Sequence, residues 1–118
     1  MFITSFGRNV APEWVESELT LQPVIAQAAV YGEARPYNVA IIVPRPIAGV
    51  ADVPQAVSRA IAAANQTLPD YAQIGKWLIA PEPFTPKNNY LTANGRLRRA
   101  EILSAYEQVI NQLYEENA

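Results

Sequence analysis

The hydrophobic positions along the chain form short strand-like runs and stretches with helical spacing. Residues 24–31 (VIAQAAVY) and 37–43 (YNVAIIV) are apolar and rich in β-branched side chains, so both predict buried strands. The turn at residues 32–36 between them is short, which predicts an antiparallel pair. Residues 74–79 (IGKWLI) predict a third strand, and residues 2–9 predict a short strand followed by a glycine-centred loop.

Helical spacing first appears after Pro12, a residue that suits the first turn of a helix. Val15 and Leu19 lie four positions apart and share one face of this helix. Three acidic residues favour its positive end, namely Glu13, Glu16 and Glu18. Asp52 can cap a second helix, and Gln55 three residues later completes a capping-box-like pattern. The core face of that helix is predicted to carry Val53, Val57, Ile61, Ala64 and Leu68.

A last helix is predicted from about Leu97 to Tyr114, after a long loop at residues 80–95. Its apolar stripe is predicted to contain Ile102, Tyr106, Val109 and Leu113. Three strands cannot bury both faces of a sheet alone, so helices must cover them. The sequence therefore predicts an α+β fold in which about three helices cover a small, three-stranded, mostly antiparallel sheet, in the order (β)αββαβα. We expect residues 1–118 to form a single domain.

Composition narrows the possible functions. Half of the 118 residues are hydrophobic and 17% are charged, which is typical of a globular chain. The net charge of −2 argues against nucleic-acid binding, and no apolar run reaches the ~20 residues that a transmembrane helix needs. Cysteine and histidine are both absent, which excludes Ser-His-Asp and Cys-His hydrolases and most zinc enzymes. We expect no metal site and a cytoplasmic or membrane-peripheral location.

Two loop segments place glycine and cations next to regular structure. In residues 4–13, Gly7 allows close approach of a ligand to the backbone, and Arg8 offers a planar cation for phosphate. The alternative interpretation is a β-to-α turn with an exposed arginine. In residues 91–99, three arginines follow an Asn-Gly turn at a helix start, where the helix dipole disfavours cations. A phosphate or a carboxylate would explain them, and the alternative is a solvated basic patch.

Three segments together resemble the C-terminal domain of the adenylate-forming superfamily. This superfamily includes acyl- and aryl-CoA ligases, luciferases and the adenylation domains of peptide synthetases. The segments are residues 3–17 (ITSFGRNVAPEWVES), 23–44 (PVIAQAAVYGEARPYNVAIIVP) and 82–103 (EPFTPKNNYLTANGRLRRAEIL). The resemblance covers nearly the whole chain and is strongest to the long-chain fatty acyl-CoA synthetase branch.

The resemblance implies a two-step reaction. A fatty acid and ATP form an acyl-adenylate and pyrophosphate, and the thiol of CoA then displaces AMP to give acyl-CoA. It also implies that a small domain rotates between the steps over an N-terminal large domain, with the acyl-adenylate and CoA at the interface. The complete enzyme would use ATP, CoA and Mg. We expect the natural protein to extend upstream of Met1, and the chain alone to be inactive with no cofactor bound.

The same resemblance assigns roles residue by residue. Gly7 matches the glycine of the loop on the CoA side, and Arg8 matches the basic position beside it. Arg99 matches an arginine three positions after the family's catalytic lysine, and Arg96 stands where that lysine is expected.

The arginine at position 96 leaves three readings open. Arg96 takes over the lysine's role, or Lys87 on the same loop swings in, or adenylation is impaired. We favour the first, because arginine keeps the charge and suits phosphate. A different class of function, a non-catalytic module that binds an anion or a partner, stays open as the alternative.

Overall fold

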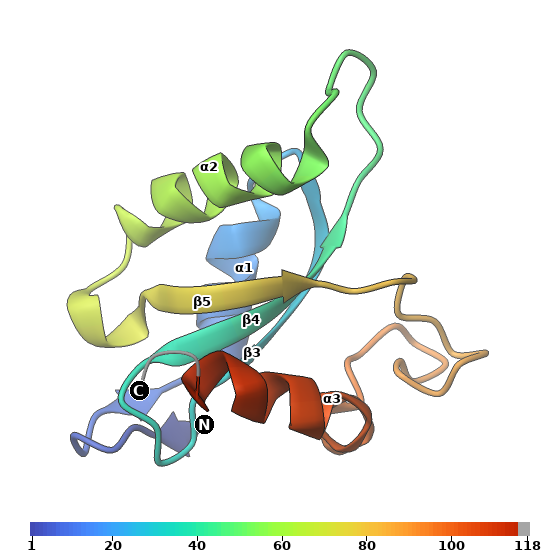
Figure 1. Cartoon of the computed structure of the whole chain (residues 1–118). Helices are drawn as coiled ribbons and strands as arrows, with labels where there is room; N and C mark the ends of the chain where they lie inside the picture. Colours follow the sequence, from blue (N-terminus) through green and yellow to red (C-terminus); the bar gives the residue numbers. More distant parts are fainter. Residues whose placement is uncertain (116–118) are drawn as a thin grey trace. The chain divides into compact units, whose positions relative to one another are not determined.

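The computed structural model describes residues 1–115, which divide into two compact units (Figure 1). The first unit is Met1–Pro81, and the second begins at Glu82. The main hydrophobic cluster lies wholly within the first unit. Among residues 1–115, no helix has the length and apolar character needed to cross a membrane.

A three-stranded sheet forms the centre of the first unit. It contains β3 (Ile25–Tyr31), β4 (Asn38–Pro44) and β5 (Ile74–Ile79), in the order β3-β4-β5. β3 and β4 are antiparallel as predicted, with Val30 opposite Ala40. β5 runs parallel to β4, because a helical crossover returns the chain to the starting edge. The predicted α+β class is confirmed, and the sheet is mixed.

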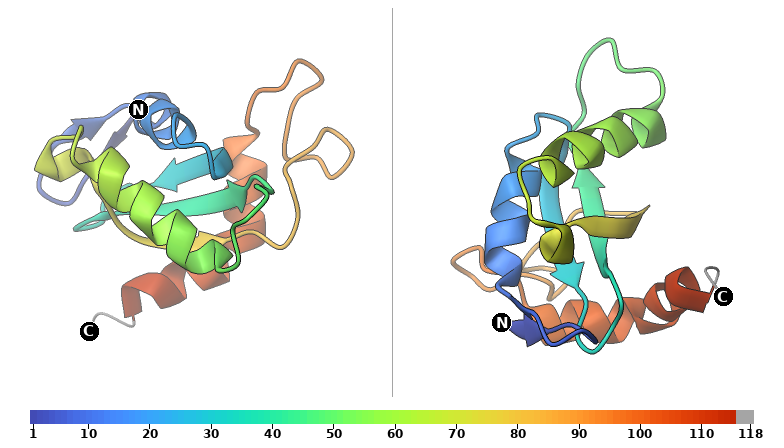
Figure 2. Two further views of the ribbon diagram at one scale, coloured as in Figure 1. Left: turned by 90° about the horizontal axis from the view of Figure 1, so that it is seen from above. Right: turned by 90° about the vertical axis from the view of Figure 1, so that its left-hand side faces the viewer.

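Two helices cover the same face of this sheet (Figure 2). They are α1 (Pro12–Thr20) and α2 (Val53–Asn65), and both were predicted from helical spacing. Side chains from both helices and all three strands meet in one hydrophobic cluster. Its buried members include Val15, Leu19, Ala28, Ala40, Ile42, Val57, Ile61, Ala64 and Ile74. The apolar periodicity of the sequence therefore identified this core correctly.

Side-chain hydrogen bonds fix both ends of α2. Asp52 caps its start as predicted, and the carboxylate accepts from the Gln55 amide at 3.0 Å. At the other end, the Asn65 side chain donates to the Ile74 carbonyl at 3.0 Å and accepts from the Ile74 amide at 2.8 Å. A short 3-10 helix, η1 (Asp70–Ala72), lies between Asn65 and Ile74 in the chain. The end of α2 is thus tied to the start of β5.

Glu16 has a different role from the one predicted. It is 8% exposed, and its Oε2 accepts from the Val30 amide at 2.7 Å. β3 is an edge strand of its sheet, so this amide needs a partner outside the β-ladder. Glu16 is therefore a buried acceptor that joins α1 to β3. The prediction of a simple helix-terminal charge was wrong for this residue.

A small hairpin precedes α1. β1 (Phe2–Ile3) pairs antiparallel with β2 (Asn9–Val10), and Phe2 stands opposite Val10. The sequence predicted the first strand and the loop but not the second strand, because two residues are too few to show alternation. The hairpin is held to the β3–β4 turn by hydrogen bonds from Ala34 N to Ile3 O and from Ser5 N to Arg35 O, at 2.8 and 3.0 Å.

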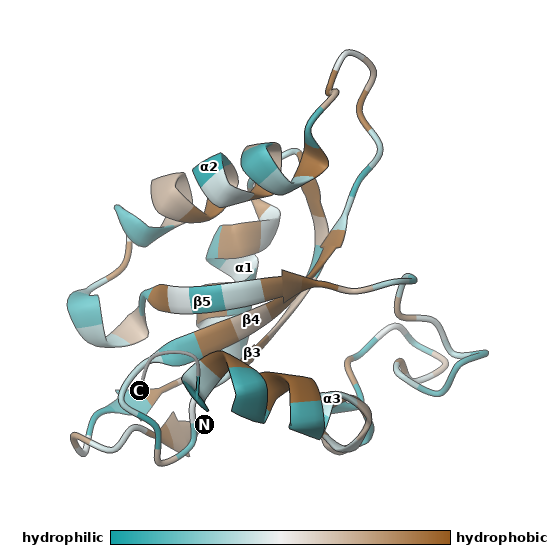
Figure 3. Cartoon of the chain, in the orientation of Figure 1, coloured by the Kyte–Doolittle hydropathy of each residue, from teal (hydrophilic) through white to brown (hydrophobic). Residues whose placement is uncertain are grey.

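The second unit consists of an irregular loop followed by α3 (Arg99–Glu115). α3 begins two residues later than predicted, because Leu97 instead pairs with Leu91 in an isolated β-bridge. Ile102 and Ile110 are buried, whereas Val109 is 43% exposed. At about 100° per residue, Val109 falls about 20° outside the arc between these two isoleucines, on the side of Ile102. Val109 is therefore an exposed member of the predicted apolar stripe, and a largely apolar stripe does run along α3 (Figure 3).

Candidate functional site

The first candidate segment is the turn that joins β1 to β2. The Thr4 amide donates to the Arg8 carbonyl at 2.9 Å, and the Gly7 amide donates to the Thr4 carbonyl at 3.0 Å. The Arg8 amide donates to Thr4 Oγ1 at 3.2 Å. Gly7 has a φ of +80°, in the left-handed region that favours glycine. This is a three-residue hairpin loop, in which a tight turn is followed by a left-handed residue.

The second candidate segment contains a turn with the same hydrogen bonds. The Thr92 amide donates to the Arg96 carbonyl at 2.8 Å, and the Gly95 amide donates to the Thr92 carbonyl at 3.0 Å. The Arg96 amide donates to Thr92 Oγ1 at 3.0 Å, and Gly95 has a φ of +85°. Asn94 Oδ1 contacts Thr92 Oγ1 inside the turn.

The two turns share the sequence pattern Thr-x-x-Gly-Arg. The first is TSFGR at residues 4–8, and the second is TANGR at residues 92–96. In both, the threonine closes the loop with its backbone and also accepts from the arginine amide with its hydroxyl. The same turn motif therefore occurs twice in the chain, and in each copy it fixes the backbone of an arginine. Sequence reasoning missed this repeat, because two variable positions in five residues give a weak signal.

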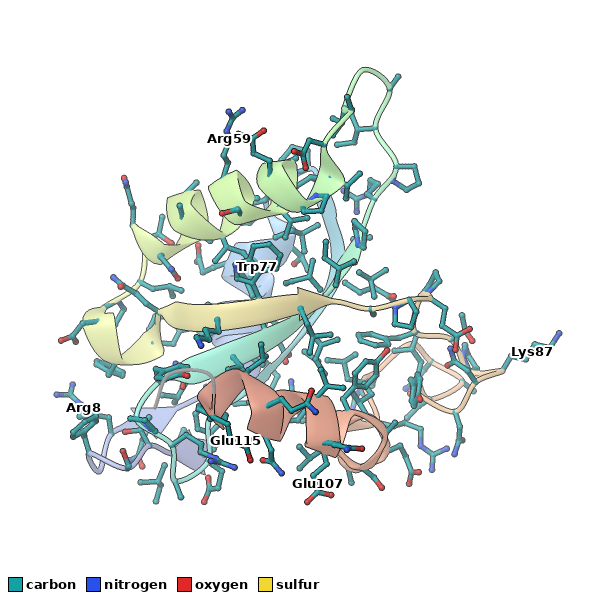
Figure 4. All side chains as sticks on the ribbon, in the orientation of Figure 1. Arg8, Arg59, Trp77, Lys87, Glu107 and Glu115 are labelled. Atoms are coloured by element: carbon teal, nitrogen blue, oxygen red, sulfur yellow. The ribbon has the colours of Figure 1, made fainter. Side chains whose placement is uncertain are left out.

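The Arg8 side chain is exposed but rests on an aromatic ring. Its guanidinium carbon lies 4.1 Å from the centroid of the Tyr71 ring, within the range of a cation–π interaction. Tyr71 belongs to η1 and is half-buried. Figure 4 shows Arg8 beside the N-terminal hairpin. Gly7 and Arg8 thus lie on one hydrogen-bonded turn, inside the loop segment that the sequence predicted.

The arginines of the second turn differ from one another. Arg96 is exposed, and across residues 1–115 its side chain makes no hydrogen bond or ion pair. Arg98 donates to Asn89 Oδ1 at 2.6 Å, so its guanidinium already has a partner. Arg99 is half-buried at the first position of α3. Of the three, Arg96 is the one that presents a solvated cation from a fixed backbone.

Lys87, the alternative cation, is exposed and extends from the loop that precedes the second turn (Figure 4). This loop is ordered by short-range hydrogen bonds. The Thr85 amide donates to Asn88 Oδ1 at 3.0 Å, and the Asn88 amide donates to Thr85 Oγ1 at 3.1 Å. Lys87 lies inside this reciprocal pair, so moving its backbone would break these bonds.

An aromatic cluster links the same loop to α3. Phe84 meets Tyr90 edge-on with ring centroids 5.9 Å apart, and the centroids of Tyr90 and Tyr106 are 6.2 Å apart. Burial raises the pKa of Tyr106, and nearby Tyr90 and Glu82 raise it further. Tyr106 therefore stays neutral at physiological pH and acts as a packing residue. Among residues 1–115, no group of acidic side chains is arranged to hold a metal ion.

The sequence of this chain matches a known family over residues 1–118, described as the AMP-binding enzyme C-terminal domain. The long-chain-fatty-acid–CoA ligase FadD15 of Mycobacterium tuberculosis is 26% identical over 134 residues, which cover 97% of this chain and 22% of the ligase. The long-chain-fatty-acid–[acyl-carrier-protein] ligase AEE15 of Arabidopsis thaliana is 30% identical over 118 residues, which cover 95% of this chain and 16% of that protein. The chain thus spans about a fifth of the length of these curated relatives.

Solved structures show the same fold. The adenylation domain of a carboxylate reductase from Mycobacterium chelonae superposes with a TM-score of 0.87 at 23% identity, over 97% of this chain and 19% of that one. The corresponding domain from Segniliparus rugosus, in complex with AMP and a co-purified carboxylic acid, gives a TM-score of 0.85 at 26% identity, over 98% of this chain and 20% of that one. The sequence match extends over both compact units and both Thr-x-x-Gly-Arg turns, so the chain belongs to the family of C-terminal domains of AMP-binding enzymes.

Proposed function

We propose that this chain is the mobile C-terminal domain of an AMP-forming acyl-CoA ligase, and that residues 1–118 act as one lid over a large domain that binds ATP and a fatty acid. The complete enzyme would convert fatty acid, ATP and CoA into acyl-CoA, AMP and pyrophosphate, with Mg accompanying the nucleotide. The observation that carries the proposal is the pair of Thr-x-x-Gly-Arg turns, which present two arginines from fixed backbones.

In this proposal, each turn serves one step. Arg96 supplies the cation for adenylation, where it stabilises negative charge on the phosphoryl oxygens. Its exposure and its lack of a side-chain partner within residues 1–115 support this role, because an unpaired guanidinium is available to an anion. Arg99, at the positive end of α3, would help to bind phosphate. Lys87 is the alternative cation for the same step.

The Gly7 turn would serve the second step, in which the thiol attacks the acyl-adenylate. Gly7 has no side chain, and a Cβ added there would meet nothing within 4 Å inside the chain. The turn therefore leaves room for a ligand to approach the backbone closely. Arg8 beside it would contact a phosphate of CoA. One small domain can serve both steps by moving between them, as lids and loops do in many enzymes.

The role of Arg96 is tested by measuring the two half-reactions separately in the complete enzyme. We expect Arg96→Ala to slow acyl-adenylate formation by about 100- to 1000-fold, the usual loss when one charge-stabilising donor is removed. Thioester formation from supplied acyl-adenylate should change far less, and Arg96→Lys should keep adenylation. The matched control is Arg59→Ala, because Arg59 is an exposed arginine on α2 (Figure 4). Equal loss in both half-reactions would refute the role.

Lys87→Ala separates the two candidate cations. If Lys87→Ala abolishes adenylation while Arg96→Ala does not, Lys87 is the catalytic cation.

The wider proposal is tested by reconstitution, in which the chain is added to the separate large domain with fatty acid, ATP and CoA. Acyl-CoA formation above the rate of the large domain alone is expected. No gain would favour a non-catalytic module that binds an anion or a partner.

A further inference from the structure

We propose that Tyr71 is a positioning residue. Its ring would hold the Arg8 guanidinium in the orientation that binds a phosphate group of CoA, the substrate that carries the thiol. This inference rests on the proposed function of the Gly7 turn. It concerns a residue outside both turns, more than sixty positions along the chain from Arg8.

The backbone of Arg8 is fixed before any ligand arrives. Its amide and carbonyl both bond to Thr4, which is 6% exposed and is therefore anchored itself. The Arg96 backbone is held by Thr92 in the same way. The two arginines differ in their side chains, because Arg8 lies over the Tyr71 ring and Arg96 has no aromatic neighbour of this kind in residues 1–115. The Tyr71 ring thus distinguishes the surroundings of the Arg8 side chain from those of the Arg96 side chain.

Tyr71 is itself held firmly. Its carbonyl accepts from Asn38 Nδ2 at 3.1 Å, and its amide donates to Asp70 Oδ1 at 2.8 Å. Asn38 is 1% exposed and also donates to the Gln73 carbonyl at 3.2 Å. The Tyr71 side chain packs against the main hydrophobic cluster. The ring is therefore a fixed platform and not a mobile surface tyrosine.

The contact leaves Arg8 able to bind an anion. A cation–π interaction uses the positive charge of the guanidinium against the ring face and consumes no N–H donor. Arginine carries five such donors in a planar fork that matches the geometry of phosphate. The Arg8 side chain is exposed and makes no hydrogen bond of its own within residues 1–115. Holding the side chain in advance lowers the entropy lost when the anion binds.

The geometry is tested first by NMR on this chain. Protons above an aromatic ring experience a ring-current shift, so the Arg8 Hδ resonances should lie upfield of those of Arg96. We expect Tyr71→Leu to remove this upfield shift and Tyr71→Phe to keep it. Arg96 is the internal control, and its resonances should not move in either variant. An Arg8 signal that is unchanged by Tyr71→Leu would overturn the inference.

The function is tested in the complete enzyme through the thioester half-reaction. We expect Tyr71→Leu to raise KM for CoA by about two- to fivefold, as the strength of an exposed cation–π contact implies, with the rate of adenylation unchanged. Tyr71→Phe should restore the wild-type KM, because the ring face remains. In an Arg8→Ala background, Tyr71→Leu should have no further effect. A further rise in KM there would indicate a purely structural role and overturn the inference.

The outcomes also separate this inference from the proposed function. If Arg8→Ala raises KM for CoA while Tyr71→Leu does not, only the role of Tyr71 is overturned. If Arg8→Ala leaves KM unchanged, the proposed role of Arg8 fails, and the role of Tyr71 fails with it.

Discussion

Gly7 and Gly95 occupy the same position in two copies of one turn, with φ of +80° and +85°. A Cβ added at either residue would meet nothing within 4 Å, so substitution causes no clash. The penalty is conformational, because an L-residue in the left-handed region is disfavoured by about 1–2 kcal/mol. We expect Gly7→Ala and Gly95→Ala each to lower the free energy of unfolding by that amount, measured by urea denaturation of the chain.

Asparagine provides the control for this prediction, because it tolerates the left-handed region better than alanine does. Gly7→Asn and Gly95→Asn should recover much of the lost stability. If the asparagine variants are as unstable as the alanine variants, the loss does not come from the backbone conformation. An unequal effect at the two glycines would show that the turns are not equivalent in solution.

Single residues were predictable where their chemistry was local. Asp52 was identified as a cap from its position before an apolar helix, and the structure confirms it. Gly7 was identified as the centre of a loop, and its φ of +80° lies in the left-handed region that favours glycine. The contact between Tyr71 and Arg8 was not predicted, because the two residues are remote in sequence. No local pattern brings two such positions together.

One buried carboxylate adds a hydrogen bond to the hydrophobic packing between α1 and β3. Glu16 accepts from the Val30 amide on the edge strand, and a buried N–H without a partner destabilises a protein by about 1–3 kcal/mol. We expect Glu16→Ala to lower the free energy of unfolding by that amount. Glu16→Gln should have a smaller effect, because the amide oxygen can still accept. Urea denaturation of both variants measures the difference.

Glu18 on the same helix is the matched control. Its carboxylate accepts from Thr67 Oγ1 at 3.1 Å, and this bond lies at the surface where water can replace it. We expect Glu18→Ala to change the free energy of unfolding by less than about 1 kcal/mol. A Glu18 variant as unstable as Glu16→Ala would mean that burial does not decide the strength of these contacts.

At the level of elements, existence was easier to predict than boundaries. Strands β3, β4 and β5 and helices α1 and α2 follow from runs of β-branched residues and from apolar spacing, which are properties of neighbouring residues. The start of α3 does not follow from local spacing, because Leu97 pairs with Leu91 in a β-bridge just before the helix. The second strand of the N-terminal hairpin likewise depends on pairing between Phe2 and Val10. The periodicity of hydrophobic residues does not predict pairings of this kind between separate positions.

At the level of the whole molecule, the family and the order of elements, apart from β2 and η1, were both available from the sequence. The division into two compact units was not predicted, because it depends on which elements pack together. The division matters for the proposed function. One Thr-x-x-Gly-Arg turn lies in the first unit and the other in the second, so the two turn arginines, which are proposed to act in different steps, belong to different units.

This separation predicts the effect of substituting both turn arginines, Arg8 and Arg96, in the same enzyme. If Arg8 acts only in thioester formation and Arg96 only in adenylation, their substitutions should not compound within either half-reaction. We expect the Arg8→Ala/Arg96→Ala double variant to match Arg96→Ala in adenylation and Arg8→Ala in thioester formation. Effects at independent sites usually add within about 0.5 kcal/mol, which sets the tolerance of the comparison. A thioester step much slower in the double variant than in Arg8→Ala would show that Arg96 also acts in the second step, because Arg8 is already absent there.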